Sequence, residues 1–308
     1  MVIERSRNMN NDVLHKTRFL WIDLVKVLSI IMVIYHHCPP NSFYGFSSLP
    51  LFFFASGLLF NIEKYPSFFT FFKRRSKQLL IPYLCFFTLF YLFWLFVGRS
   101  LSSPEEQALP LYTPLLEFLY GRPVNVCLPL WYLPCLFVLQ SFFYFLKYIN
   151  KKITTILILL IPFINNFIDL SDSPWMLDNV CEYFPYYGIA CLYRKEIFNI
   201  FKEMSNISFI MPVNELFNTI TYNFELNKSI KYLASNTVII LACHTYVIRL
   251  VDILIINVLG FDSGIYDGNL IFKISLTIFV MLSMYIPIII INRYLPFIIG
   301  KGRLFEKK

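Results

Sequence analysis

Charged residues are scarce in this chain of 308 residues, of which only 15% are Asp, Glu, Lys or Arg and 57% are hydrophobic. A soluble domain usually carries about 25% charged residues, so this chain has too little polar surface to cover a globule in water. This shortage excludes a large soluble catalytic domain. The chain is instead rich in aromatic residues, with 34 Phe and 20 Tyr, and its mean hydropathy is +0.60. The composition therefore indicates a polytopic membrane protein.

The sequence also lacks the patterns that mark nucleic-acid binding and metal binding. Its net charge is +8, but the basic residues are scattered between apolar runs and do not gather on one water-facing surface, so we expect no nucleic-acid partner. The seven cysteines form no CxxC pair and have no metal-ligand spacing. We interpret them as packing thiols and expect no metal site.

Eight apolar runs are long enough, or nearly so, to cross a bilayer, which requires about 20 residues. They fall at about 19–38, 47–62, 79–98, 127–146, 153–170, 180–193, 234–256 and 269–291. The sequence therefore predicts an all-α, polytopic integral membrane helix bundle of about eight transmembrane helices. Polar residues interrupt segment 203–231, which we expect to lie in the cytoplasm or on the membrane surface. Two short spans there would raise the number to ten.

In this predicted topology, most Lys and Arg residues lie on one side of the membrane. Of the 27 Lys and Arg residues, 22 lie at the termini or in loops that would share the side of the N-terminus, whereas loops 169–182 and 262–267 carry Asp and Glu. Because cytoplasmic loops hold the excess of Lys and Arg, both termini are expected in the cytoplasm. The predicted parts are a cytoplasmic segment 1–18, a membrane domain 19–301 and a cytoplasmic tail 302–308.

The first apolar run contains the densest set of ionisable residues, namely Asp23, Lys26, His36 and His37. A charge at the centre of a spanning helix costs about 2.5–3.5 kcal/mol, so such residues are candidates for function. At 3.6 residues per turn, Asp23, Lys26 and His37 share one helix face, and His36 points about 100° away. The alternative is an interfacial ion pair of Asp23 with Lys26 and two histidines that mark the membrane boundary.

Several motifs resemble the membrane acyltransferase 3 family, in which the first span carries a cation, ten residues and then a histidine. Lys26 and His37 have this spacing within the segment that starts at Arg18. The fucose 4-O-acetylase-like branch is the most similar. Further motifs resemble the family in the same order: 49–57 (LPLFFFASG), the basic segment 73–83, 130–133 (LWYL), 184–188 (FPYYG), 243–245 (CHT) and 292–301.

The resemblance implies an O-acyltransferase, most simply an O-acetyltransferase, in the bacterial cytoplasmic (inner) membrane. Acetyl-CoA would be the acyl donor and co-substrate, and the acceptor would be a hydroxyl of an extracytoplasmic or lipid-linked glycan. A histidine with a pKa near the operating pH suits such chemistry as a general base or a transient acyl carrier. We therefore expect His37 to be catalytic, together with Lys26 and Asp23, and leave open which of the two roles His37 has.

The donor carries phosphates, which cations on the cytosolic side would contact. Arg74, Arg75 and Lys77 are the candidates, although the positive-inside rule alone also predicts such a cluster. Three residues in the resembling motifs, His244, Trp131 and Ser56, are expected to contact the substrate; for Ser56, close helix packing beside Gly57 is the alternative. Lys273 is expected to reach the membrane interface with its long side chain.

Two other function classes compete with this interpretation. The first is a transporter or flippase that uses Asp23, Lys26 and His244 as substrate or proton-relay groups. The second is a family member without catalysis that acts in glycan assembly. Two departures bear on the second class: the family usually has about ten spans, and the basic loop here reads Arg74-x-x-Lys77 instead of two arginines. The oligomeric state does not follow from the sequence.

Overall fold

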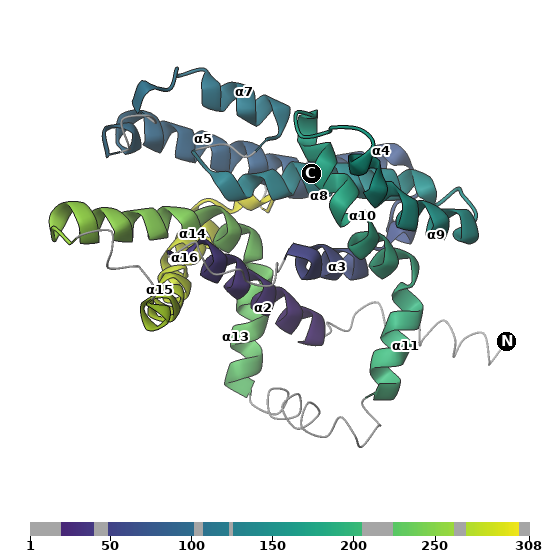
Figure 1. Ribbon diagram of the computed structural model, residues 1–308. Coiled ribbons are helices and arrows are strands. Elements are labelled where there is room, and N and C mark those ends of the chain that lie inside the picture. The colour runs from purple at the N-terminus through teal and green to yellow at the C-terminus, as the bar shows by residue number, and fades with distance from the viewer. Residues whose placement is uncertain are drawn as a thin grey trace.

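The computed structural model describes residues 20–39, 49–101, 107–122, 126–204, 224–261 and 269–301. In these ranges the regular elements are helices and none is a strand (Figure 1). The all-α class predicted from the sequence is therefore confirmed. The predicted terminal segments 1–18 and 302–308, and residues 205–223 of the weakly apolar stretch, lie outside the described residues.

The α-helices follow one another along the whole described chain. They are α2 (Leu20–His37), α3 (Leu49–Leu59), α4 (Phe68–Arg75), α5 (Ile81–Phe96), α7 (Thr113–Tyr120), α8 (Tyr132–Leu146), α9 (Lys151–Leu160), α10 (Leu177–Leu192), α11 (Arg194–Met204), α13 (Phe224–Ser235), α14 (Thr237–Asp252), α15 (Leu270–Ser283) and α16 (Tyr285–Tyr294). A π-helical turn, Ser76–Leu80, joins α4 to α5, and a second, Ile253–Val258, continues α14.

Five helical segments are long and apolar enough to cross a membrane: Leu20–His37, Phe68–Phe96, Leu128–Leu146, Thr237–Ile256 and Leu270–Tyr294. Each coincides with one of the eight predicted runs, although the second begins before its run. These five segments identify an integral membrane protein. The total of eight to ten spans and the cytoplasmic location of the termini stay predictions.

The other three predicted runs form shorter helices. α3 has 11 residues, α9 has 10 and α10 has 16, so at 1.5 Å per residue they extend over about 15–24 Å. α9 begins where the Asn150 side chain accepts the backbone N–H of Lys152, and it passes into a 3₁₀ turn at Ile161, just before Pro162. Proline lacks the N–H that a longer α-helix would need there.

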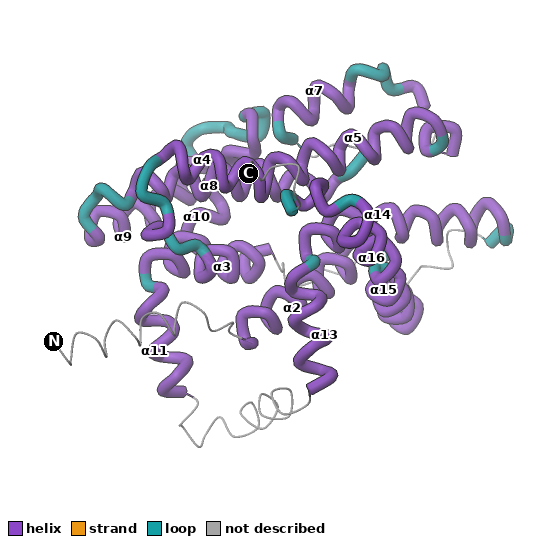
Figure 2. Tube along the Cα trace, turned by 180° about the vertical axis from the view of Figure 1, so that it is seen from behind, coloured by secondary structure: helices purple, strands orange, loops and turns teal. Residues whose placement is uncertain are grey.

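Helix α3 lies at the centre of the bundle, between α10 on one side and α2 on the other (Figures 1 and 2). The close approach depends on Gly57. A Cβ atom at this position would meet the carbonyl oxygen of Tyr187 and would lie 2.9 Å from the Cβ of Ala190, both in α10. Glycine therefore permits backbone contact between α3 and α10, as small residues do between membrane helices.

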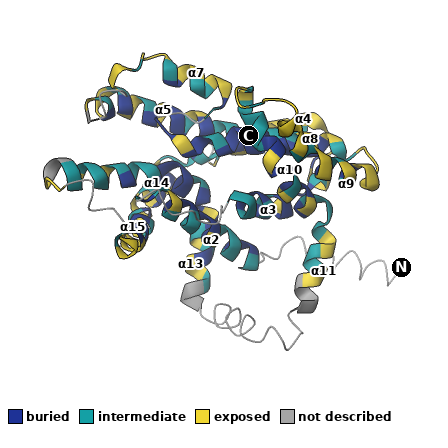
Figure 3. Cartoon of the chain, viewed as in Figure 1, coloured by how far each residue is buried: buried dark blue, intermediate teal, exposed yellow. Residues whose placement is uncertain are grey.

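The outer surface of the bundle is apolar. Along α15 and α16, Ile271 is 78% exposed, Leu282 71% and Ile286 64%. Figure 3 shows exposed faces on α7, α9 and α15, whereas buried positions are frequent along α8, α10 and α14. An apolar surface of this extent fits contact with lipid and would be unfavourable in water.

Candidate active site

His37 and His244 meet although 206 residues separate them in the chain. His37 is the last residue of α2, His244 lies in the middle of α14, and their ring centroids are 5.2 Å apart. His244 is fully buried and His37 is half-buried. His36, whose ring centroid is 6.2 Å from that of His37, is exposed. The bundle therefore selects His37, not His36, for contact with the second histidine.

The backbone of α14 fixes the protonation pattern of His244. Its Nδ1 lies 3.0 Å from the carbonyl oxygen of Ile240, one helical turn earlier. Because a carbonyl oxygen only accepts hydrogen bonds, Nδ1 carries the proton and Nε2 is left with a lone pair. Among the described residues, no donor reaches this buried Nε2 atom. A buried polar atom without a partner is costly, so the Nε2 lone pair is a candidate for a functional contact.

His37 also lines a cavity of about 180 Å³, which we call the histidine cavity. Its walls come from α2, the start of α3, the turn before α8, and α14: Val33, His36, His37, Leu49, Pro129, Trp131, Tyr132 and Leu241. Two residues predicted to act in the site, His37 and Trp131, thus share one cavity. Ser56 does not line this cavity, but its Oγ is 2.8 Å from the hydroxyl oxygen of Tyr132, which does.

Tyr132 is a site residue that the sequence analysis missed. It begins α8 directly after Trp131, in a turn that Pro129 opens, and its ring packs on Phe52 and Phe53 of α3. Its hydroxyl is the polar group that Ser56 contacts in the cavity wall. The position inside the motif at 130–133 was the available signal, but that motif gives no spatial relation to His37.

Lys26 and Asp23 lie on α2, away from the histidine cavity. Lys26 is 11 residues before His37, a rise of about 16 Å. Its Nζ donates a hydrogen bond of 2.7 Å to the carbonyl oxygen of Ala234, in the last turn of α13. A cation at a helix C-terminus satisfies a carbonyl without an intrahelical partner and favours the helix dipole. Asp23 is buried in the first turn of α2.

The predicted donor-binding cations, Arg74, Arg75 and Lys77, lie around the junction of α4 with the π-helical turn, and none of them lines the histidine cavity. Arg75 donates a 2.9 Å hydrogen bond to Gln78, and its guanidinium is 5.0 Å from the centre of the Phe60 ring. Arg74 is exposed. The structure therefore keeps these cations apart from the histidines, beside the end of α3.

Lys273 differs from the sequence-based expectation. The expectation that it reaches the membrane interface is wrong, because its exposure is only 1%. α15 packs against α2 and places the Lys273 ammonium 4.6 Å from the centre of the Tyr35 ring. A cation over an aromatic face is favourable when both are removed from water. A single lysine in the apolar run 269–291 was the signal, and only the packing of α15 shows which way it points.

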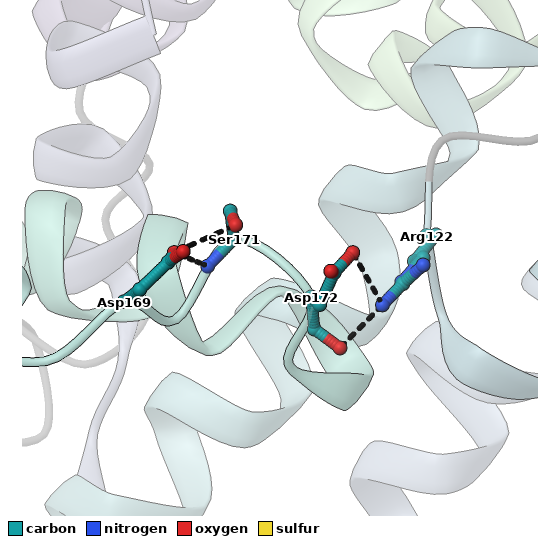
Figure 4. Close-up of polar contacts among 4 residues, drawn as sticks. All are labelled: Arg122, Asp169, Ser171 and Asp172. Carbon is teal, nitrogen blue, oxygen red and sulfur yellow. Dashed lines mark hydrogen bonds and ion pairs between the residues drawn. The ribbon is translucent and has the colours of Figure 1, made fainter.

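The acidic loop before α10 is tied to the segment after α7 (Figure 4). The guanidinium of Arg122 lies 3.1 Å from the carboxylate of Asp172 and also donates to the Asp172 carbonyl oxygen. The Asp169 carboxylate accepts bonds from the backbone N–H (2.9 Å) and the hydroxyl (2.6 Å) of Ser171. These bonds hold the pKa of the Asp169 carboxyl below its usual value. Both carboxylates therefore have structural partners.

The side chains that could ligate a metal are dispersed in the part of the chain that the structure describes. There, no three His, Cys, Asp or Glu side chains come together in a group that could hold a metal ion. The seven cysteines are unpaired, and five of them are buried. The polar groups in or beside the histidine cavity are the imidazoles of His36, His37 and His244 and the hydroxyls of Ser56 and Tyr132.

Comparison with known proteins gives one match. A family model described as an acyltransferase domain, that of the acyltransferase 3 family, matches residues 19–214. No curated protein and no solved structure matches the chain. The matched range contains α2 to α11, hence His37, Ser56 and Trp131, whereas His244 lies after it. Because the match spans well over half of its length, the chain belongs to the acyltransferase 3 family.

Proposed function

We propose that the protein is an integral membrane O-acetyltransferase that moves an acetyl group from acetyl-CoA to a sugar hydroxyl of an extracytoplasmic or lipid-linked glycan. The observation that carries the proposal is the contact of His37 with His244 at the wall of the histidine cavity. Family membership supports acyl transfer. Acetyl as the acyl group, the glycan as acceptor, the fucose 4-O-acetylase-like branch and the bacterial cytoplasmic membrane are parts of the proposal.

The reaction needs one base. The acceptor hydroxyl oxygen attacks the carbonyl carbon of the thioester, the new C–O ester bond forms, and the C–S bond breaks. The hydroxyl proton passes to the imidazole of His37, which then delivers it to the departing sulfur. A neutral histidine suits both steps because its ordinary pKa of about 6.5 lies close to physiological pH.

His244 would act as a positioning residue for His37. Its Nδ1–H is held by the Ile240 carbonyl, so its Nε2 lone pair is available to the N–H of a neighbouring imidazole. Such a base, oriented by another group, is the common arrangement in nucleophilic and acid–base sites. The Tyr132 hydroxyl, supported by Ser56, would donate to the thioester carbonyl oxygen as negative charge develops there.

The remaining predicted residues take roles away from the acyl group. Lys26 and Asp23 would orient α2 against α13 and so hold His37 in place. Arg74, Arg75 and Lys77 would meet phosphates of the donor as it enters the bundle. This division follows the placement of the residues, since none of these five lines the histidine cavity.

The direct test is mass spectrometry of surface glycans from cells that carry the wild-type protein, His37→Ala, His36→Ala or no copy. We expect glycan with an acetyl-sized mass increase in cells with the wild type, and a smaller fraction of such glycan with His36→Ala. We expect none with His37→Ala or without the protein. His36→Ala is the matched control because it removes a neighbouring imidazole from the same cavity. An unmodified glycan in all strains, with a changed amount exported, would instead favour a transporter.

A further inference from the structure

A second and larger cavity lies at the opposite end of α3 from the histidine cavity. Its volume is about 710 Å³, within the range of about 300–1,000 Å³ that is common for small-molecule sites. Its walls are the residues after α3, the end of α8, the start of α9 and the junction of α10 with α11. Figure 1 shows α9 and the start of α11 at this end of the bundle. We call it the basic pocket.

Cations outnumber carboxylates in the wall of this pocket. Four basic side chains line it, and two acidic ones: Lys147, Lys151, Arg194 and Lys195 against Glu63 and Glu196. Within the described ranges of the chain, Lys151 is the one cation of the four in an ion pair, at 2.6 Å from Glu196. The remaining charge is positive, and an anion in the pocket would offset it.

Of these four cations, Arg194 is the one with a buried donor atom that lacks an acceptor among the described residues. The side chain is half-buried at the start of α11, and the buried donor atom is its Nε. Its guanidinium lies 5.5 Å from the centre of the Phe198 ring, and burial lowers the pKa of this guanidinium below its usual value. A guanidinium remains charged under such conditions and offers planar, paired donors that match a phosphate.

The rest of the wall is apolar and aromatic. Phe60, Phe143 and Phe198 line the pocket beside the cations, which suits a ligand with a planar or apolar part next to its negative charge. α3 also connects the two cavities: Leu49 lines the histidine cavity and Phe60 the basic pocket. Phe60 follows Leu49 by eleven positions, which corresponds to about 16 Å at the rise of an α-helix.

We propose that the basic pocket binds a phosphate-bearing ligand, with Arg194 and Lys195 contacting the phosphate oxygens. Two sources have this chemistry, the nucleotide of the acyl donor and the headgroup of an anionic lipid. The donor fits the position, since its thioester is carried on a long flexible arm away from its phosphates and would extend along α3. This identification rests on the proposed function, whereas phosphate binding by the pocket does not.

The test uses the full chain in nanodiscs of neutral lipid and measures binding of adenosine 3′,5′-bisphosphate by calorimetry. We expect Arg194→Gln to weaken binding about tenfold or more, since a charged hydrogen-bonding partner is lost. Lys195→Gln, at an exposed position, should weaken binding severalfold. Lys152→Gln is the matched control, since Lys152 is exposed at the start of α9 but does not line the pocket, and it should leave binding unchanged.

Two further arms separate the outcomes. Native mass spectrometry measures how much phosphatidylglycerol the purified protein retains. If Arg194→Gln and Lys195→Gln lose this lipid, and neither the wild type nor any variant binds the nucleotide, the pocket is a phosphate site whose ligand is a lipid headgroup. Unchanged binding of both probes in these two variants overturns the proposal. His37→Ala should bind the nucleotide like the wild type, so failure of the proposed catalysis would leave this result intact. Arg194→Lys should restore part of the affinity lost in Arg194→Gln.

Discussion

The segment covered by the family model and the segment after it contribute different halves of the candidate site. Residues 19–214 provide His37, Trp131 and Tyr132. The helices after residue 214 provide His244, which contacts His37, and Ala234, whose carbonyl binds Lys26. The site is therefore completed by helices outside the family match. A substitution in either segment should affect the same reaction if both belong to one site.

The largest effect is expected for His37→Ala, which removes the proposed base from the matched segment. A general base contributes about 10²–10⁴-fold to a rate, so acyl transfer by the purified enzyme should fall by about that factor while membrane insertion and melting temperature stay unchanged. His36→Ala should reduce the rate less. Equal tolerance of both substitutions would refute the assignment of His37.

Lys26→Ala removes a hydrogen bond that joins α2, in the matched segment, to α13, in the following one. Without the ammonium, the Ala234 carbonyl at the end of α13 loses its charged partner, and such a bond contributes about 1.5–3 kcal/mol to stability. Since α14 follows α13 after one residue, we expect displacement of His244 and loss of acyl transfer, together with a lower melting temperature.

Lys26→Arg retains a cation at this position and should keep part of the activity. Lys26→Met is the matched control for side-chain length, because it keeps the apolar stem and removes the charge. If Lys26→Met were as active as Lys26→Arg, the charge would be unnecessary and the hydrogen bond to α13 would not explain the role of Lys26.

His244→Ala tests the segment outside the family match. The substitution removes the imidazole that faces His37, and misplacement of a catalytic group by about 1 Å costs about 10²-fold in rate. Rates measured at several pH values separate positioning from packing: loss of positioning should change the pH profile of the reaction, whereas a packing defect should lower it evenly. A rate like that of the wild type would confine the site to the matched segment.

The fold was largely predictable because its main determinant is local. A long apolar run predicts a membrane helix from its own residues alone, and five of the eight predicted runs form helices long enough to span a membrane. The lengths of the other three were not predictable in the same way. α9 stops near Pro162, and α3 ends at Leu59 within an apolar run, so hydropathy alone overestimates both.

Some residues around the histidine cavity were named from the sequence, but Tyr132 was not, and none of their contacts could be predicted. His37 follows from its position on the first run, and Trp131 from a short motif, but their common cavity depends on how α2, α3 and α8 pack. His244 was expected to contact substrate, and its contact with His37 could not be predicted because the two residues are 207 positions apart in the sequence. The orientation of Lys273 toward α2 was predicted wrongly for the same reason, since burial depends on the neighbouring helix.

Gly57→Val acts within the matched segment and should affect stability more than chemistry. The added side chain would collide with the Tyr187 carbonyl and with Ala190 in α10, and overpacking of this kind costs about 1–3 kcal/mol. We expect a lower melting temperature in detergent. Gly260→Val compares the same substitution at a position with free space, since no atom lies within 4 Å of a Cβ atom there. The φ of +71° at Gly260 still strains the backbone of any residue with a side chain.

The smallest effect is expected for Glu196→Gln, which removes the Lys151–Glu196 ion pair at the edge of the basic pocket. Both side chains are about half-exposed, and exposed pairs contribute about 0–1 kcal/mol. The hydrogen bond from Lys151 lowers the pKa of the Glu196 carboxyl, so the contribution is present above the pKa of Glu196 in the unfolded chain and is lost as pH falls through its folded value. The melting temperatures of wild type and Glu196→Gln should therefore differ slightly near neutral pH and converge in acid. A difference that persists below the folded pKa would show that Glu196 stabilises the α9–α11 contact by packing and not by charge.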